Sequence, residues 1–496
     1  MKNKIIKTFI LCLAILFTFN CASFAIEENN VEKKKLTRKE KKIAKEKKKY
    51  ARYTIPTTEM IPEELEPDKL TIEGSVAKSL ELNLADCLEL ALTYNPLIKA
   101  QYSQAQATKT LKGQALSNYS PKINLGAGIS RLKPNLSSSG FNMDVDPLTQ
   151  YTVGEISVSQ LIYDFGITQN LYHVRKLEYE AALNNIENTV NDVIYQVKNA
   201  YYMLVTEIEQ ERVMEDTVDQ FEQTYEQAHA FYQVGMKPKI DVTIAATNLA
   251  DAKANLIQAK NAVDIATATL NNVMGLPFIA KYSIEENLPY EELDVDINKL
   301  VEIANENRPA LKNSVLGVKQ AEQAWKLSKK SYFPTLSFQG AFGGAGNNNR
   351  DLGEFWNLGG YFQFNAINPF LVKNQIDEKR HLFEKQQYIS DASVNDIYFE
   401  IQKTWANLID AKDRVPVALL SMKMSKENYE LASGRYKVGE SDAIELKDAQ
   451  IQYQNSRLMY FTTLYEYNRE KANLEKAVGQ TLKSTPVGIE EIKLKN

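Results

Sequence analysis

A long internal duplication constrains this chain more than any other feature of its sequence. Pro96 and Pro121 are matched 213 residues later by Pro309 and Pro334. Further along, the segment 232–235 (Tyr-Gln-Val-Gly) is matched 204 residues later by 436–439 (Tyr-Lys-Val-Gly). Repetition at such a regular spacing indicates one structural unit that is used twice.

Each copy contains a stretch that predicts an unusually long helix. Residues 167–234 form a run of 68 residues without glycine or proline, which as one helix would measure roughly 100 Å. From Val242 to Val273 alanine alternates with larger apolar residues at steps of three and four, as in a coiled-coil seam. Two shorter helices placed end to end beside the long one would form a wall of uniform length. The expected helices are at about 96–118, 167–234 and 238–274 in the first copy, and at about 309–331, 372–438 and 441–478 in the second. Pro416 falls inside the second long helix, which it is expected to bend or break.

Strand signals lie between the short and the long helix of each copy. Apolar residues alternate with small or polar ones, which is typical of transmembrane barrel strands. The alternation changes phase near Glu155 and Ile156, which indicates a β-bulge. Segments rich in glycine, serine and asparagine at 137–140 and 343–349 predict the hairpin loops. The expected strands are at about 121–133, 151–165, 334–343 and 355–368.

Aromatic residues gather near the ends of these strands, and they include Tyr151, Tyr163, Phe165, Trp356 and Phe370. In a membrane protein such residues form a belt at the lipid–water interface. An ordinary packed core is the alternative interpretation.

The N-terminus has the pattern of a secretory signal peptide over residues 1–25, with basic residues, a short apolar core and small residues before the cleavage point. A lipid anchor on Cys21 is the competing interpretation. Residues 26–79 are expected to be a basic, disordered arm, since 33–52 hold twelve lysines and arginines. Binding to anionic lipid or nucleic acid is the alternative for this arm, and the export signal argues against nucleic acid.

Enzymatic chemistry has little support in the sequence, and no catalytic residue, cofactor or metal site is predicted. The three histidines, His173, His229 and His381, lack a second ligand at metal-binding spacing. The segment 344–346 (Gly-Ala-Gly) lacks the lysine and the helix start of a phosphate-binding loop. Cys87 lies on an apolar helix face without a nearby base, and it is expected to be part of the core.

Four strands per chain are too few to close a barrel in a membrane, because an open edge in lipid leaves backbone groups unpaired. Closure therefore requires strands from other copies of the chain, and three copies would supply twelve. The fold class that follows is mainly α with a transmembrane β part. It consists of a duplicated helix, β-hairpin, long helix and helix, assembled as a trimeric 12-stranded β-barrel continued by an α-helical barrel.

Several motifs resemble those of the TolC-type outer-membrane efflux and secretion channels. They are Leu84-Ala85-Asp86-Cys87-Leu88 up to Asn95-Pro96, the strand entry at Pro121, the segment 159–166 (Ser-Gln-Leu-Ile-Tyr-Asp-Phe-Gly), and the two Tyr-x-Val-Gly hairpins. The resemblance covers about residues 80–482. It implies a homotrimer in the outer membrane with a periplasmic helical tunnel, docked to a periplasmic adaptor protein and an inner-membrane transporter. The implied function is that of a passive conduit in a tripartite efflux pump or a type I secretion system.

The resemblance also assigns roles to particular residues. The hairpin tips that contact the adaptor would be Val234, Gly235 and Met236 in the first copy, and Val438, Gly439 and Glu440 in the second. The pore constriction would be formed by Asp241, Glu445 and Asp448. A solvated helix face is the alternative interpretation of the last pair. Ser441 stands where well-known members have an arginine that ties the tip closed, so the latch of those members is in doubt here.

The predicted organisation is a first repeat at 80–280, a connecting equatorial segment at 281–298, a second repeat at 299–482 and a tail at 483–496. Two other classes remain open. A periplasmic coiled-coil adaptor has one helical hairpin flanked by β domains, while this chain has two hairpins. A structural envelope protein is the second alternative.

Overall fold

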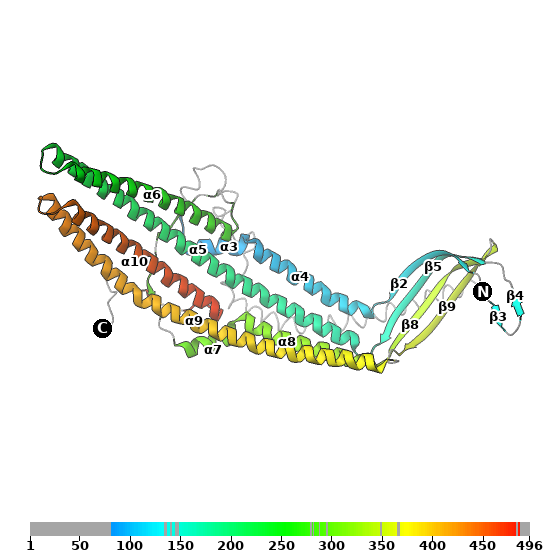
Figure 1. Ribbon diagram of the computed structural model, residues 1–496. Coiled ribbons are helices and arrows are strands. Elements are labelled where there is room, and N and C mark those ends of the chain that lie inside the picture. The colour runs from blue at the N-terminus through cyan, green and yellow to red at the C-terminus, as the bar shows by residue number, and fades with distance from the viewer. Residues whose placement is uncertain are drawn as a thin grey trace. The chain divides into compact units, whose positions relative to one another are not determined.

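The duplication of the sequence is seen in the fold as two copies of one series of helices and strands (Figure 1). The computed structural model describes residues 81–132, 136–138, 141–143, 148–277, 280, 282–286, 288–293, 296–347, 350–364, 368–482 and 485–486. These residues belong to one structural unit of the chain, Leu65–Asn496. The predicted signal peptide with Cys21, the basic arm and most of the tail lie outside the described residues.

Each copy consists of two short helices, a β-hairpin, a long helix and a helix that returns along it. In the first copy these are α3 (Leu84–Tyr94), α4 (Pro96–Leu116), β2 (Lys122–Leu132), β5 (Leu148–Tyr163), α5 (Ile167–Gln233) and α6 (Lys239–Met274). In the second they are α7 (Ile297–Asn307), α8 (Pro309–Lys329), β8 (Thr335–Asn347), β9 (Arg350–Gln363), α9 (Pro369–Lys437) and α10 (Ala443–Val478).

Short strand pairs complete the described structure. Near the middle of the helices, β1 (Glu81–Leu82) pairs in parallel with β6 (Ser283–Ile284), and β7 (Glu291–Glu292) pairs antiparallel with β10 (Thr485–Pro486). Between β2 and β5, β3 (Leu136–Ser138) and β4 (Phe141–Met143) form a further hairpin. No helix in the described part of the chain is both long enough and apolar enough to cross a membrane.

Capping side chains explain where two of the helices begin. The Oδ1 atom of Asn95 accepts a hydrogen bond from the Leu97 amide at 2.8 Å, and Pro96 occupies the first position of α4. Asn368 caps α9 in the same way, with the Leu371 amide at 3.0 Å and a proline at the first position. As a result α9 begins at Pro369, earlier than the predicted residue 372.

The long helix α9 continues through Pro416 as one helix of 69 residues. A break at this proline, one of the two outcomes that the sequence suggests, does not occur. The neighbouring Val415 is fully buried, and α9 packs on both α8 and α10. Because tertiary packing supplies most of the stability of helices in proteins, it offsets the backbone hydrogen bond that the proline removes.

Two helices of each copy lie end to end beside the long one (Figure 1). They are α4 and α6 beside α5 in the first copy, and α8 and α10 beside α9 in the second. Where they meet, a Cβ atom on Gly275 would lie 2.9 Å from the carbonyl oxygen of Tyr94, and one on Gly479 would lie 3.1 Å from the Cα atom of Arg308. This close backbone approach, together with φ angles of +76° and +73°, accounts for a glycine at the same place in both copies. Because α5 also packs on α8 and α10, the helices form two rows, α4–α5–α8–α9 and α6–α5–α10–α9.

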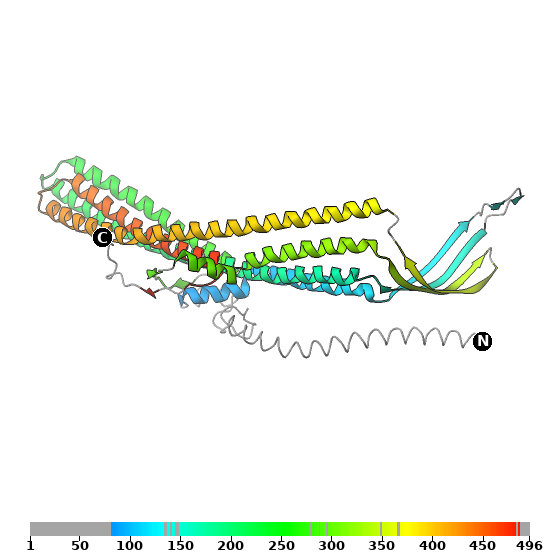
Figure 2. The same ribbon diagram turned by 90° about the horizontal axis from the view of Figure 1, so that it is seen from below.

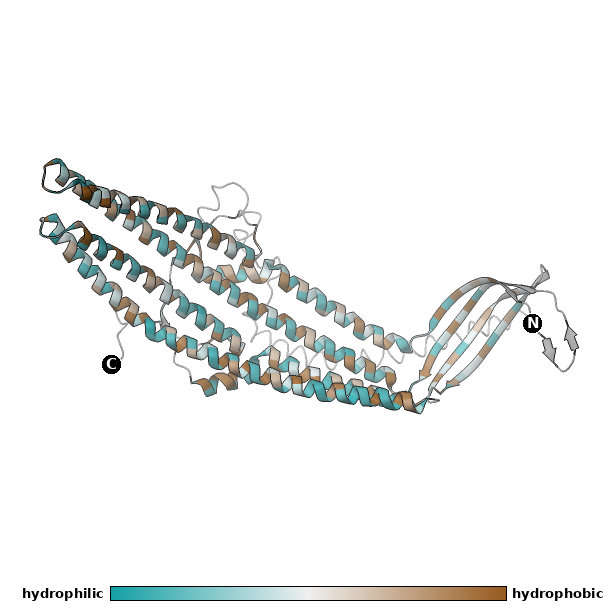
Figure 3. Cartoon of the chain, viewed as in Figure 1, coloured by the Kyte–Doolittle hydropathy of each residue, from teal (hydrophilic) through white to brown (hydrophobic). Residues whose placement is uncertain are grey.

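The four main strands form one antiparallel sheet in the order β2-β5-β8-β9. Its pairing places apolar residues in rows on one face and small or polar residues on the other, and the strands carry apolar residues at intervals (Figure 3). One apolar row is Leu125, Ile156, Phe342 and Trp356. The neighbouring polar row is Asn124, Ser157, Ala341 and Asn357.

Two local features of the sheet bear on the predictions. The pairing register shifts between Val153 and Glu155, around Gly154 with its φ of +69°, so the predicted bulge is present. The predicted loop at 343–349 is mostly wrong, because β8 continues to Asn347 and pairs there with Arg350. Glycines 343 and 344 belong to the strand, where the Phe355 ring lies against Gly343.

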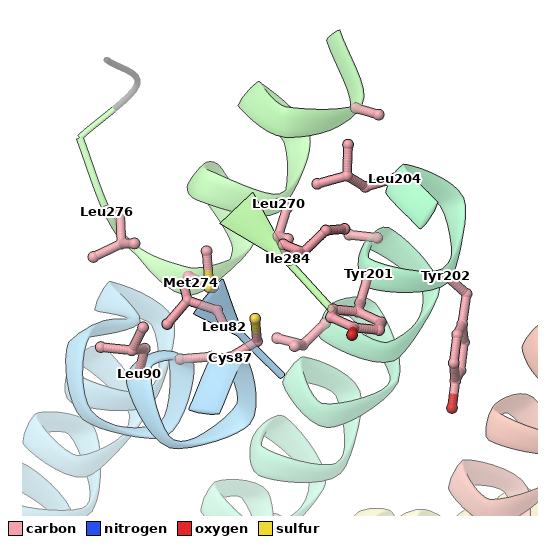
Figure 4. Close-up of a cluster of buried hydrophobic side chains, with 14 of the residues drawn as sticks. Leu82, Cys87, Leu90, Tyr201, Tyr202, Leu204, Leu270, Met274, Leu276 and Ile284 are labelled. Atoms are coloured by element: carbon pink, nitrogen blue, oxygen red, sulfur yellow. The ribbon is translucent and has the colours of Figure 1, made fainter. Parts of the chain in front are cut away.

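Each copy has its own apolar core, located where its shorter helices meet on the long one. In the first copy, Leu82, Cys87, Leu90, Leu270 and Met274 are fully buried together, beside Tyr201 of α5 (Figure 4). The second copy has an equivalent cluster that includes Leu300, Ile401, Leu408, Tyr467 and Leu474. From these cores the paired helices extend to the two hairpin tips, at the end of the helices away from the sheet (Figure 2).

Candidate functional site

The two helical hairpins end in exposed apolar tips. Val234 and Met236 are 70% and 67% exposed between α5 and α6, and Val438 is 71% exposed between α9 and α10. Gly235 and Gly439 make the turns with φ angles of +77° and +79°. Apolar side chains so exposed at the end of a helical hairpin are available to a partner.

Contacts between the hairpins hold the two tips together. The Phe231 ring packs edge-on against Tyr436, with ring centroids 6.1 Å apart. The Lys237 amine donates a hydrogen bond to the carbonyl oxygen of Ser441 at 3.4 Å. Ser441, which stands in place of an arginine, is itself buried. Its backbone carbonyl accepts the hydrogen bond from Lys237 of the other hairpin.

The three predicted constriction residues have different surroundings. Asp241, in the first turn of α6, acts electrostatically on Tyr436, and burial together with this carboxylate raises the pKa of the Tyr436 phenol. Glu445 forms an ion pair with Arg435, with Nη1 and Oε1 2.5 Å apart. Asp448 lies one turn further along α10, and its carboxylate is 3.5 Å from the Lys447 amine.

The cationic partners of these acids were not predicted. Arg435 and Glu445 are ten residues apart on opposite sides of a turn, so no helical spacing connects them in the sequence. A basic residue just before the Tyr-x-Val-Gly turn, with an acid in the first turn after it, is the signal that would have revealed the pair.

A polar seam between α5 and α10, also missed at the level of sequence, joins the two copies. It contains a hydrogen bond from Gln450 to Thr224 at 3.1 Å and one from Tyr465 to Asn199 at 2.9 Å. Ion pairs connect the same two helices at Arg457–Asp216, Lys198–Glu475 and Lys476–Asp192. Within the first hairpin, α5 and α6 share an apolar contact between Phe221 and Ala252, and ion pairs such as Lys253–Glu222 lie beside it.

The predicted interface aromatics fall into separate groups. Phe165 stacks on Phe333 at 5.2 Å and contacts Tyr163 edge-on at 4.8 Å, where the strands meet the helices. Phe370, the second residue of α9, is highly exposed. The side chain of Tyr151 lies outside the described residues.

Trp356 lies further along the sheet, in the apolar row described above. From Trp356 to Phe364 every second residue has an exposed apolar side chain, except at the glycine at position 360. At 3.3–3.4 Å per residue this band is roughly 26 Å long along the strand. Its nine residues, 356–364, are close to the 9–11 that a tilted transmembrane strand needs.

Within the described residues, no group of three histidine, cysteine, aspartate or glutamate side chains is placed to hold a metal ion. Glu445 and Asp448 are paired with cations, and Cys87 is buried in the first core. The arrangement offers a two-faced sheet, paired helices and hairpin tips with exposed apolar side chains.

Comparison with known proteins agrees with this architecture. The model of the outer membrane efflux protein family matches residues 87–276 and 300–480, one stretch in each copy. The chain is 20% identical over 436 residues to the outer membrane protein TolC of Escherichia coli K12. This match covers 83% of this chain and 85% of TolC.

Solved structures share the fold. The Campylobacter jejuni CmeC outer membrane channel has a TM-score of 0.71 and 18% identity, and the match covers 80% of this chain and 85% of CmeC. The open state of the Neisseria gonorrhoeae MtrE outer membrane channel has a TM-score of 0.65 and 18% identity, and the match covers 87% of this chain and 99% of MtrE. The fold class implied by the resemblance is thereby confirmed. Since the family model matches most of the chain and both copies of its repeat, this protein belongs to the outer membrane efflux protein family.

Proposed function

We propose that this chain is the outer-membrane channel of a tripartite efflux pump or a type I secretion system. Three copies would form one passive conduit, with the sheet in the outer membrane and the helices in the periplasm. A periplasmic adaptor and an inner-membrane transporter would deliver the substrate. The family consists of channel proteins and not enzymes, which leaves the two alternatives, an adaptor and a structural envelope protein, without support.

The observation that carries this proposal is the sheet. Among the described strands, β2 pairs only with β5 and β9 pairs only with β8, so both edges are open. An apolar band on one face suits lipid, and open edges in lipid cost several kcal/mol for each unpaired backbone group. Three four-stranded sheets joined edge to edge would close a barrel of twelve strands, within the range of bacterial barrels.

The helices support the same assembly. α9 lies at the end of both helical rows, and apolar residues form a stripe on its exposed side. The stripe consists of Val417, Leu420, Met424 and Leu431. At these spacings they share one helix face, and a second copy of the chain would bury it.

Roles for individual residues follow from this arrangement. Rings of Glu445, Asp448 and Asp241 would narrow the periplasmic end of the pore. The tips Val234, Gly235 and Met236, with Val438, Gly439 and Glu440, would contact the adaptor. Tyr163, Phe165, Trp356, Phe370 and Tyr151 would lie near the membrane interfaces.

Imaging of the purified protein tests the proposal. Protein extracted from outer membranes with detergent is expected to run as trimers that dissociate on heating, and single particles are expected to show hollow cylinders with threefold symmetry. In planar bilayers it is expected to conduct ions. A stable monomer that stays soluble without detergent and forms no channels would refute the proposal.

A further inference from the structure

The second hairpin tip contains an ion pair that crosses its turn. Arg435 lies in the last turn of α9 and Glu445 in the first turn of α10, with Nη1 and Oε1 2.5 Å apart. The carboxylate of Asp442 accepts hydrogen bonds from the amides of Ile444 and Glu445 at 3.1 and 2.8 Å. This cap fixes the start of α10, and with it the position of Glu445 opposite the arginine.

Asp448 is held more loosely. Its side chain is 66% exposed, compared with 42% for that of Glu445. The Lys447 amine lies 3.5 Å from its carboxylate, but the two residues are adjacent in the chain and do not face each other on the helix. A lysine amine is a mobile, strongly hydrated charge, whereas the planar guanidinium of an arginine loses less freedom on pairing.

Two other charged groups of the tips have different neighbours. The Lys237 amine is at the carbonyl oxygen of Ser441, and Asp241 acts on the buried Tyr436. Among the described contacts, Arg435 is therefore the cation that compensates Glu445.

We infer that Arg435 is a residue that determines the ion selectivity of the pore. It cancels the charge of Glu445 within each chain, so Asp448 contributes more negative charge to the constriction than Glu445 does. This inference rests on the proposed function, because it requires that these acids line a conducting pore. It refines the assignment of both acids to the constriction, since Glu445 and Asp448 contribute unequally.

Reversal potentials in planar bilayers with a KCl gradient test the inference. Arg435→Gln exposes the Glu445 charge and is expected to raise the K⁺/Cl⁻ permeability ratio by roughly two- to fivefold, the range set by one partly exposed pair. Glu445→Gln alone leaves the Arg435 charge without its partner and is expected to lower the ratio, whereas in the Arg435→Gln background it is expected to reverse the increase. Asp448→Asn is expected to lower the ratio in either background.

Arg435→Lys serves as the matched control and is expected to change the ratio less than Arg435→Gln, because it keeps the positive charge. Trimer formation of each variant is checked by gel mobility without heating. The inference is wrong if trimeric Arg435→Gln channels keep the wild-type ratio, or if the double variant Arg435→Gln with Glu445→Gln keeps the raised ratio of Arg435→Gln. Absence of conductance in the wild-type protein would instead overturn the proposed function, and the inference with it.

Discussion

Lys198 on α5 and Glu475 on α10 form an ion pair that joins the two copies of the repeat, with Nζ and Oε2 2.5 Å apart. The two side chains are only 14% and 8% exposed. The second carboxylate oxygen of Glu475 accepts a hydrogen bond from the Leu482 amide at 3.0 Å. Glu475 therefore links α10 to α5 of the first copy and also to the segment that follows α10.

Loss of this lysine is expected to be costly. Lys198→Met leaves the Glu475 carboxylate buried without its cation, which typically costs about 3–5 kcal/mol. The double variant Lys198→Met with Glu475→Gln removes both charges and keeps an acceptor for Leu482, so we expect it to be more stable than the single variant. Thermal unfolding followed by circular dichroism at 222 nm compares the three proteins.

The pair Lys476–Asp192 on the same two helices is the control. Its side chains are 33% and 50% exposed, and Lys476→Met is expected to cost less than about 1 kcal/mol. Equal losses in the two lysine variants would show that burial of the Lys198 pair has no special effect.

Two glycines with nearly equal φ angles differ in their surroundings. Gly275 is in contact with the backbone of Tyr94, while a Cβ on Gly235 would meet no atom within 4 Å. Gly235→Ala is expected to cost only the left-handed conformation, roughly 1–2 kcal/mol. Gly275→Ala adds a clash between α6 and α3 and is expected to lower the thermal midpoint further. Similar midpoints for the two variants would contradict the end-to-end contact of α4 and α6.

Adjacent residues of β2 test which face of the sheet meets lipid. Leu125 belongs to an apolar row and Asn124 to a polar one. A lysine at a lipid-facing midplane position costs about 2–4 kcal/mol. Leu125→Lys is expected to reduce heat-dissociable trimers in outer-membrane fractions, while Asn124→Lys is expected to leave them near the wild-type amount. The opposite order would place the polar face against the lipid.

The sequence predicted the elements of the fold because they follow local rules. Helix-breaking residues are absent across the long helices, and period-two alternation marks the strands. The glycine-rich run at 343–347 was misread as a loop because glycine weakens a strand prediction, while the ring of Phe355 covers Gly343 in the sheet. The sequence also left open whether Pro416 breaks the second long helix, since packing of that helix on two others is not visible along the chain.

The surroundings of the candidate site were less accessible to prediction. The positions of Glu445 and Asp448 were assigned by resemblance, and their roles remain predictions. Their partners depend on how a turn folds back on itself, as for Arg435, ten residues from Glu445. The seam between α5 and α10 joins residues more than 200 positions apart, such as Thr224 and Gln450, which no local pattern connects.

The exposed valine of the second tip provides a test of partner contact. Val438→Asp places a charge on an apolar tip without disturbing a buried neighbour, and we expect it to reduce export in cells while trimer yield is unchanged. Val315→Asp is the control, because Val315 is also exposed but lies on α8, away from the tips. Export assays in a host that lacks its own copy of the gene compare the two. Normal export by Val438→Asp would argue against contact at this tip.

The thiol of Cys87 reports on the first core. Burial raises its pKa from 9.0 to about 12, so at pH 8 the native protein holds an inaccessible thiol and not a reactive thiolate. Because the folded pKa is raised, stability from the protonated thiol is complete below pH 9 and is lost as pH rises towards 12. We expect no reaction of the native chain from residue 26 onward with Ellman's reagent at pH 8, and one thiol after denaturation. Val234→Cys, at an exposed tip, is the control and is expected to add one thiol that reacts at once. If native Cys87 reacts as fast, the first core is open to solvent in solution, contrary to its complete burial here.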